Sequence, residues 1–225
     1  MQIFGRNSKE LSLISDELKI PFSTETLANA DLYIIAVSDG AISEVSKQIR
    51  EKNCLVVHTS GSVSINELTG NYRKGVLYPL QTFSKSKKLD YSQIPFFIDA
   101  EYENDLASLE ELALNISERV MSANDEKRKY IHLTAVFACN FVNHLYARAK
   151  EISDSQEIPF DYFLPLIDET TQKIHELEPK LVQTGPAVRG DEKILELHEA
   201  LISDENQLKI YKTLNESIQK MYHLK

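Results

Sequence analysis

Short apolar runs alternate with helical patterns through the first half of the chain. The runs at residues 31–37 and 54–58 are almost continuously apolar, which is typical of strands buried on both faces of a sheet. The predicted strands span residues 1–4, 19–22, 31–37, 54–58, 75–80, 95–99 and 119–122. The predicted helices between them span residues 8–18, 39–51 and 104–117, with Ser8 as the expected cap of the first. This alternation predicts a parallel sheet covered by helices.

The second half of the chain has only helical patterns. One of them runs from about residue 125 to 152 without Gly or Pro, and no strand pattern follows it. Three further helices are predicted at residues 161–177, 192–202 and 205–222. We therefore expect an α/β domain over residues 1–123 and an all-α domain over residues 124–225.

Composition and charge exclude some classes of function. The chain has 225 residues, 42% of them hydrophobic, and a net charge of −9, so a buried core is expected. No basic run is longer than Lys87-Lys88, and a solvated loop explains residues 84–88 better than a nucleic-acid-binding patch. Neither a leader segment nor an apolar run of about 18 residues is present, so we expect a soluble, cytoplasmic protein. Cys54 and Cys139 stand alone and are expected to be buried, without a disulfide or a metal.

Candidate chemistry follows three of the predicted strands. Ligands bind at the carboxyl ends of parallel strands, where helix N-termini point free N–H groups outward. The three segments there are Gly5-Arg6-Asn7-Ser8, Val37-Ser38-Asp39-Gly40 and His58-Thr59-Ser60-Gly61-Ser62. Arg6 stands where an NAD site usually has an acidic residue, and its guanidinium suits a 2′-phosphate, although an incidental surface Arg is an equal alternative. Ser38 or Asp39 could simply cap a helix, whereas the third segment is denser in hydroxyl groups than a turn requires. The G-x-S-x-G pattern of a hydrolase is absent.

Two further segments carry polar groups in unusual positions. His132, Val136, Asn140 and Asn143 share one sector of the long predicted helix. They predict either a buried polar network or, beside a cleft, a general acid (His132) and an amide that orients a carbonyl (Asn140). The loop at residues 183–191 has two Gly, a Pro and Arg189, and could close over a site or lock two subunits together; Arg189 and Asp191 could also form only a local salt bridge.

The combination of these segments resembles a known bacterial family. The resemblance rests on HTSGS (58–62), GVLYPLQTFS (75–84), HLTAVFACNFVNHLYA (132–147), FLPLIDET (163–170) and QTGPAVRGD (183–191), and it extends over nearly the whole chain. The family has a Rossmann-like NADP-binding domain and a C-terminal helical domain of unknown function. It is similar to pyrroline-5-carboxylate reductase, the 3-hydroxyacid dehydrogenases and the deazaflavin-dependent NADP oxidoreductases. The resemblance therefore implies hydride transfer with NADP, without naming a substrate.

The resemblance also implies roles for particular residues. Arg6, Asn7 and Ser8 would contact the adenosine 2′-phosphate of NADP; Val37, Ser38 and Asp39 would lie along the dinucleotide; and His58, Thr59 and Ser60 would lie near the nicotinamide. From the helical domain, His132 and Asn140 would line the cleft. Tyr78 stands where the family has a His before Pro79.

The chain departs from this family at its N-terminus. A strand followed by a G-x-G-x-x-G/A turn, which holds the pyrophosphate, is expected ahead of the first strand seen here, and the sequence has no such motif. Its absence would expose strand edges at the centre of the sheet. We expect the natural protein to begin further upstream, the alternative being a degenerate member that binds dinucleotide weakly.

Three functions remain open from the sequence. The first is an NADP-dependent oxidoreductase acting on a small carbonyl, imine or hydroxy-acid-like substrate. The second is a non-catalytic NADP-binding or sensing protein, and the third is a helical dimerisation scaffold with a vestigial Rossmann half. A homodimer formed through the helical domain is expected in any of these cases, and neither a nucleic acid nor a membrane is an expected partner.

Overall fold

A five-stranded, mostly parallel sheet is the centre of the first of two compact units. The computed structural model describes residues 1–84 and 87–222, and the chain divides into Met1–Phe141 and Val142–Lys225. In spatial order the strands are β3 (Leu32–Ile35), β4 (Leu55–His58), β5 (Arg73–Pro79), β6 (Phe96–Ala100) and β7 (Val120–Ser122). Neighbouring strands run parallel except β5 and β6, which are antiparallel. The α/β prediction is confirmed, with this one reversed pair.

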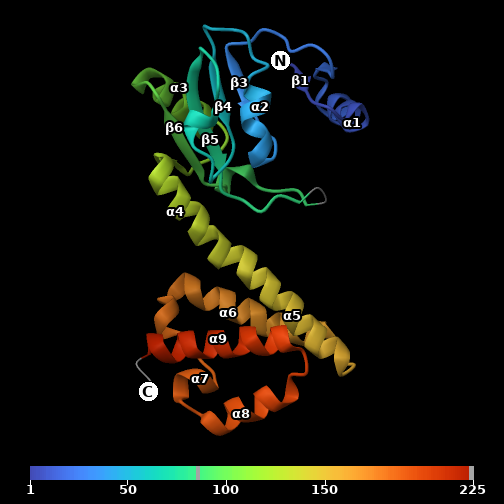
Figure 1. Cartoon of the computed structure of the whole chain (residues 1–225), viewed down its shortest axis with the longest axis vertical. Helices are drawn as coiled ribbons and strands as arrows, with labels where there is room; N and C mark the ends of the chain where they lie inside the picture. The colour runs from blue at the N-terminus through green and yellow to red at the C-terminus, as the bar shows by residue number, and fades with distance from the viewer. Residues whose placement is uncertain (85–86, 223–225) are drawn as a thin grey trace. The chain divides into compact units, whose positions relative to one another are not determined.

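Helices cover both faces of this sheet. On one face α3 (Glu103–Leu114) places Leu109 and Ala113 against a buried cluster from β4, β5 and β6. On the other face α2 (Ile42–Ser46) contributes Ile42 to a second cluster with Val56 and Tyr72 (Figure 1). Alternate residues of β4 enter different clusters because successive side chains of a strand point to opposite faces. The predicted helix at residues 39–51 is shorter than expected, since a 3-10 turn, η1 (Asp39–Ala41), comes before α2.

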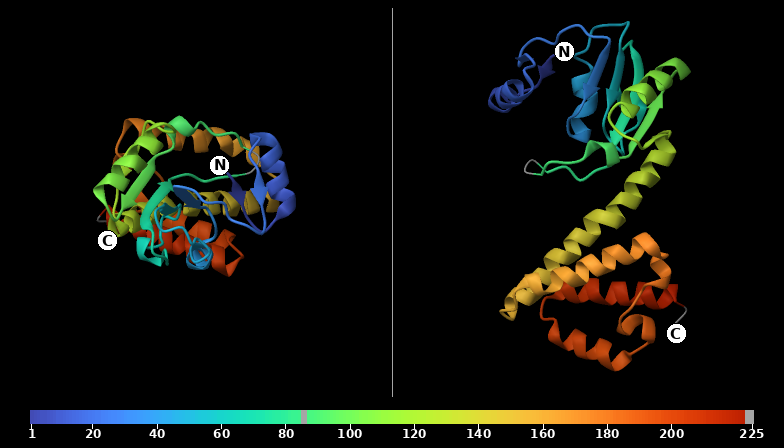
Figure 2. Two further views of the ribbon diagram at one scale, coloured as in Figure 1. Left: turned by 90° about the horizontal axis from the view of Figure 1, so that it is seen from above. Right: turned by 180° about the vertical axis from the view of Figure 1, so that it is seen from behind.

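The N-terminal segment stands apart from the five-stranded sheet. β1 (Ile3–Phe4) and β2 (Phe22–Ser23) form their own parallel pair around α1 (Ser8–Leu18), beside but not joined to β3 (Figures 1 and 2). A cavity of roughly 600 Å³ lies between them and is lined by residues of β1, α1, β3 and α2. Because β3 pairs only with β4 among the described residues, Ile34 is 50% exposed. The prediction that residues 31–37 are buried on both faces is therefore wrong on the cavity side.

The first helix is capped one residue earlier than the sequence suggests. Asn7 has extended backbone and its side chain accepts a hydrogen bond from the backbone N–H of Glu10 (3.3 Å). Ser8 is the first residue of α1 rather than its cap. Asn and Ser are about equally good caps, so the sequence offered no basis to choose between them.

The long helix predicted from residue 125 is present but contains a π-helical segment. It consists of α4 (Asp125–Ala135), the π-helix η4 (Val136–Phe141) and α5 (Val142–Ser155). Cys139 lies in η4 and is exposed, so its predicted burial is wrong, whereas Cys54 is buried as predicted. The structure changes from strands to helices near residue 124, where we placed the boundary, but the compact units divide after Phe141 because α4 packs into the first unit.

The second unit contains helices and 3-10 turns. Its elements after α5 are η5 (Phe160–Phe163), α6 (Leu164–Glu176), η6 (Pro179–Leu181), α7 (Pro186–Arg189), α8 (Glu192–Leu201) and α9 (Glu205–Met221). Figure 2 shows α9 beside α5 and α6, and the Gln207 amide of α9 donates to the Glu151 carboxylate of α5 (3.0 Å). None of the helices in residues 1–84 and 87–222 is both long enough and apolar enough to cross a membrane. Lys85 and Ser86, in the basic segment 84–88, lie outside the described residues.

Candidate functional site

The loops after β3 and β4 are joined at the carboxyl edge of the sheet. The hydroxyl of Ser62 donates to the Asp39 carboxylate (2.8 Å), and the backbone N–H of Thr59 donates to the carbonyl of Ile35 (3.2 Å). β3, β4 and β5 are mutually parallel, so their carboxyl ends meet at one edge. Two of the three segments selected from the sequence are thus brought together at the edge where α/β folds bind ligands.

The hydroxyl-rich loop after β4 is held in shape by its own side chains. The hydroxyl oxygen of Ser60 accepts hydrogen bonds from the backbone N–H groups of Ser62 and Val63, both at 3.2 Å. The Nδ1 atom of His58 accepts one from the backbone N–H of Ser60 (3.2 Å). Such side-chain-to-backbone bonds replace the regular ladder at a turn. The loop is therefore a fixed platform, leaving the partly exposed Thr59 side chain near its outer surface.

His58 is a buried, neutral imidazole. Its side chain is fully buried, and its Nε2 atom makes no hydrogen bond of normal geometry. Burial lowers the pKa of His58 to about 4 and the nearby Arg128 charge acts in the same direction, outweighing the opposite effect of Asp125. The acceptor role of Nδ1 places the remaining proton on Nε2. This residue supports the loop from beneath rather than facing a ligand directly.

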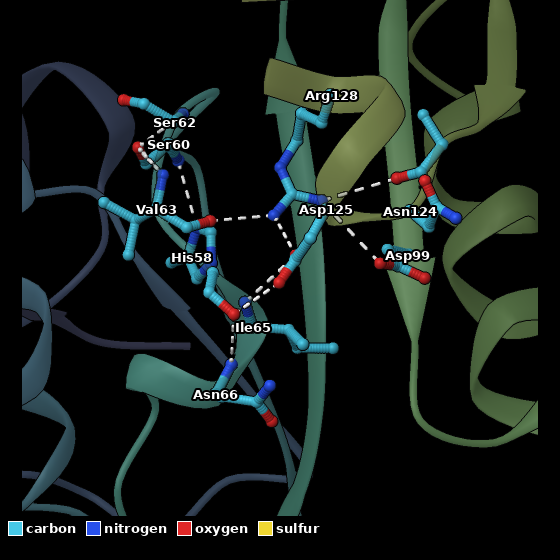
Figure 3. A network of polar contacts seen from close by, with 12 residues as sticks. His58, Ser60, Ser62, Val63, Ile65, Asn66, Asp99, Asn124, Asp125 and Arg128 are labelled. Atoms are coloured by element: carbon cyan, nitrogen blue, oxygen red, sulfur yellow. Dashed lines mark hydrogen bonds and ion pairs between the residues drawn. The ribbon is translucent and has the colours of Figure 1, made fainter. Parts of the chain in front are cut away.

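A buried arginine ties the start of α4 to the sheet and to the loop after β4. Only 1% of the Arg128 side chain is exposed. Its guanidinium donates to the backbone carbonyl of Val63 (2.7 Å), pairs with Asp125, and lies 3.7 Å from the Asp99 carboxylate on β6 (Figure 3). Asp125 in turn accepts from the Ser64 hydroxyl and from the backbone N–H of Ile65 (3.2 Å). A buried charge needs such partners, because an isolated one is strongly disfavoured.

The two carboxylates of this network have opposite pKa shifts. Burial acts to raise the pKa of Asp125, but hydrogen bonds from Ser64, Arg128 and Ile65 outweigh it and hold the pKa below its usual value. Burial raises the pKa of Asp99, and the more distant Arg128 offsets this only in part. Asp125 is therefore the main counter-ion of Arg128.

A tyrosine and a histidine meet beside the same loop. Tyr78, near the carboxyl end of β5, places its hydroxyl 3.2 Å from the Nδ1 atom of His132 on α4. The Tyr78 side chain is buried, and its ring packs next to Gly61 in the loop after β4. Burial, followed by the charge of Asp39, raises the pKa of the Tyr78 hydroxyl. His132 thus reaches the carboxyl edge of the sheet, where it meets Tyr78.

The remaining predicted site residues are more dispersed. Arg6, Asn7 and Ser8 are exposed at the end of β1, on the segment across the cavity from β3. Val37 lines that cavity, and Ser38 caps η1 without a side-chain hydrogen bond. Asn140 is exposed in η4. In a π-helix, residue i bonds to i+5 rather than to i+4, so side chains are spaced differently around the axis. The shared sector predicted for His132, Val136, Asn140 and Asn143 assumed a regular α-helix, and η4 interrupts it.

The conspicuous loop at residues 183–191 has a packing role in the second unit. It forms the short helix α7, whose Ala187 is 3% exposed, between Gly185 and Gly190, which both have positive φ angles. The side chain of Asp191 accepts a hydrogen bond from the N–H of Ile194 (3.4 Å) and caps α8. Positive φ explains the two glycines, because residues with a Cβ rarely adopt it.

Sequence reasoning missed Arg128, Asp125 and Ser64. Residues 125–129 read DEKRK, a run of charges that usually marks a solvated helix face. Nothing in the run distinguishes the buried Arg128 from the exposed Lys127 and Lys129 beside it. Asn124, whose side chain accepts a hydrogen bond from the N–H of Lys127 (3.0 Å), caps this helix.

Comparison with known proteins places this geometry in a family. The family described as Domain of unknown function (DUF2520) matches residues 94–218. No curated protein matches significantly. The crystal structure of a "putative NADP oxidoreductase" from Bacteroides fragilis is 40% identical, with a TM-score of 0.91, and the match covers 98% of this chain and 88% of that one.

More distant structures share the fold. A 1-pyrroline-5-carboxylate reductase from Streptococcus pyogenes is 12% identical, with a TM-score of 0.62 over 99% of this chain and 89% of that one. A reductive aminase from Aspergillus terreus, in complex with NADPH and ethyl levulinate, is 12% identical, with a TM-score of 0.69 over 99% of this chain and 88% of that one. The family match over more than half of the chain and the 40% identity to the Bacteroides protein show that this chain belongs to the DUF2520 family, with a Rossmann-like first part and a helical second part.

Proposed function

We propose that this protein is an NADP-dependent oxidoreductase that acts on a small carbonyl, imine or hydroxy-acid-like substrate. The observation that carries the proposal is the 40% identical "putative NADP oxidoreductase" of Bacteroides fragilis, which the chain matches over nearly its full length. The joined loops after β3 and β4 support it, because they provide a fixed, hydroxyl-rich edge where such folds bind dinucleotides.

Residues at the carboxyl edge and at the end of β1 suit the parts of NADP. The exposed guanidinium of Arg6 offers a planar, permanently charged fork for the 2′-phosphate, with Asn7 and Ser8 beside it. Val37, Ser38 and Asp39 would follow the dinucleotide, and Thr59 and Ser60 would approach the nicotinamide. Since His58 is buried, we propose that it acts by shaping this loop. We propose that His132 and Asn140 contact the substrate.

Calorimetric titration with NADPH and NADH tests the cofactor. We expect tighter binding of NADPH, and Arg6→Gln should weaken NADPH binding by about 10- to 100-fold, the value of a charged hydrogen bond to a phosphate, without changing NADH binding. Arg50→Gln, which removes another exposed arginine, is the matched control and should change neither affinity.

An extended form of the protein should be titrated alongside, because the cavity beside β3 has room for a further strand. A strand followed by a G-x-G-x-x-G turn would be joined ahead of Met1, so that the strand can pair with β1 and β3 and the turn can hold the pyrophosphate. Binding by this form alone would assign the phosphate contacts to the added turn. If neither form binds NADPH, the oxidoreductase proposal fails and the scaffold becomes the better account.

A panel of small carbonyl compounds, cyclic imines and hydroxy acids tests the reaction. Oxidation of NADPH or reduction of NADP⁺, followed at 340 nm, should occur with at least one compound. Tight NADP binding without turnover over the whole panel would instead favour a non-catalytic binding or sensing protein.

We also propose that the protein forms a homodimer through its helical half. Among the described residues of the second unit, the buried hydrophobic side chains are only Ala187 and Leu195. Many large apolar side chains of this unit are exposed instead, among them Leu166 of α6, and Leu197 and Leu201 of α8. An exposed apolar surface of this kind usually marks an interface.

A further inference from the structure

Tyr78 is a chemically active side chain at the carboxyl edge to which the proposed function assigns no role. It lies near the end of β5, parallel to β4, and therefore at the same edge as the loops that follow β3 and β4. Its hydroxyl meets the Nδ1 atom of His132 at 3.2 Å, and the two ring centroids are 6.2 Å apart. Only 8% of the side chain is exposed.

The backbone of the loop after β4 fixes the position of this phenol. A Cβ at Gly61 would lie 2.5 Å from Cζ and 2.8 Å from the hydroxyl oxygen of Tyr78, distances that a real side chain cannot adopt. On another side the ring packs on Phe97 of β6, with centroids 6.2 Å apart. Glycine at position 61 thus allows the loop to lie directly on the hydroxyl end of Tyr78. Such close support is typical of groups held in position for function.

We propose that the Tyr78 hydroxyl is the proton donor of the reduction and that His132 restores its proton. The inference rests on the proposed function. Bound at this edge of the sheet, NADPH would supply a hydride to the carbon of a C=O or C=N bond. The π electron pair of that bond moves to the oxygen or nitrogen, which takes the phenolic proton. His132 then passes its Nδ1 proton to the phenolate while Nε2 takes one from water, so the imidazole ends neutral and solvent supplies the net proton.

The hydrogen-bond pattern permits this direction of transfer. A hydroxyl both donates and accepts, so the Tyr78 oxygen can accept from Nδ1–H of His132 while its own O–H points to a substrate. The raised pKa of Tyr78, caused first by burial, keeps the phenol protonated at neutral pH.

Two substitutions distinguish the role of Tyr78 as proton donor from the role of His132 in restoring its proton. Tyr78→Phe removes the hydroxyl and keeps the ring, and we expect kcat to fall by about 10²- to 10⁴-fold, the usual contribution of general acid catalysis. His132→Asn keeps a polar atom near the position of Nδ1 but cannot relay a proton, so kcat should fall about 10-fold or more with KM little changed. Tyr91→Phe, at an exposed tyrosine of η3 (Tyr91–Gln93), is the control and should leave kcat unchanged.

Binding and spectroscopy supply readouts that do not depend on turnover. NADPH affinity, measured by calorimetry, should stay within about 2-fold in both variants, since neither residue is assigned to hold the cofactor. In protein labelled with ¹³C at histidine, Tyr78→Phe should shift the His132 resonance, whereas Tyr91→Phe should not. An unshifted His132 signal would show that the pair is not hydrogen-bonded and would overturn the proposal.

The outcomes distinguish this inference from the proposed function. If the wild-type protein neither binds NADPH nor turns over any compound of the panel, the proposed function fails and the proton relay fails with it. If the wild-type protein turns over a compound and Tyr78→Phe does so equally well, only the relay is overturned. Loss of kcat in Tyr78→Phe with unchanged NADPH affinity, together with an intermediate loss in His132→Asn, is the result that supports it.

Discussion

His58 shows how one residue at the candidate site can depend on its neighbours for its charge state. The imidazole is fully buried at the end of β4 and its Nδ1 atom holds the N–H of Ser60. Burial and the charge of Arg128 make its neutral form the stable one. Protonation would place a second cation beside a guanidinium that is already buried. The neutral form of His58 therefore contributes to the stability of the loop after β4.

This predicts a loss of stability in mild acid. The pKa of His58 is about 4 in the folded protein and near 6.5 when unfolded, so the unfolded chain binds more protons between these values. Stability from this residue is complete above about pH 6.5 and is lost progressively as the pH falls toward 4, by up to about 3 kcal/mol. Urea unfolding at a series of pH values should show this loss.

A matched pair of variants identifies the residue responsible. His58→Asn keeps an acceptor for the N–H of Ser60 but does not titrate, so its unfolding free energy should change less between pH 6.5 and 4 than that of the wild type. His175→Asn, at an exposed position of α6, should retain the wild-type dependence. An unchanged slope in His58→Asn would show that another group causes the acid sensitivity.

At the scale of elements, the start of α4 is attached to the sheet by charge more than by apolar packing. Arg128 connects α4 to the loop after β4 through the carbonyl of Val63 and to β6 through Asp99. Ile131 adds an apolar contact to the cluster of Val76 and Phe97. This attachment places His132, one turn further along α4, next to Tyr78.

Removing the central charge should therefore loosen α4. In Arg128→Met, Asp125 and Asp99 would lose their buried cation, and we expect the free energy of unfolding to fall by about 3 kcal/mol or more. Lys129→Met, at the exposed neighbour, should change it by less than about 0.5 kcal/mol. Denaturant unfolding followed by circular dichroism measures both. Equal, small effects would mean that the buried network contributes little.

At the scale of the whole molecule, the two units differ in how much core they bury. The described part of the first unit has three clusters of buried side chains, whereas the second relies on Ala187, Leu195 and partly exposed contacts. A unit with so little buried apolar surface is marginal by itself. The homodimer proposed for the helical half would supply the missing burial.

The dimer is tested by a charge placed on the exposed apolar surface. Leu166 of α6 is 65% exposed in one chain, so Leu166→Asp would cost little in a monomer but would bury a carboxylate in an interface. We expect light scattering to give a dimer for the wild type and a weakened dimer for Leu166→Asp. Gln172→Asp, at another exposed position of α6, should remain dimeric. A monomeric wild type would contradict the proposal.

Much of this architecture could be predicted from local patterns in the sequence. The strands predicted at residues 54–58, 75–80 and 95–99 and the long helix predicted from Asp125 are present, because strand and helix periodicity depends on nearby residues. The hydroxyl-rich loop after β4 was identified as a candidate site for the same reason: its residues are consecutive.

Only the tertiary structure decided which distant side chains meet and which are buried. Arg128 is buried among charged neighbours that are not, Cys139 is exposed in a π-helical turn, and Ile34 lines the cavity beside β3, which pairs only with β4 among the described residues. The contact of Tyr78 with His132 joins residues 54 positions apart in the sequence. Local periodicity determines the elements, but burial and partners depend on how those elements pack, and a single sequence does not display that packing.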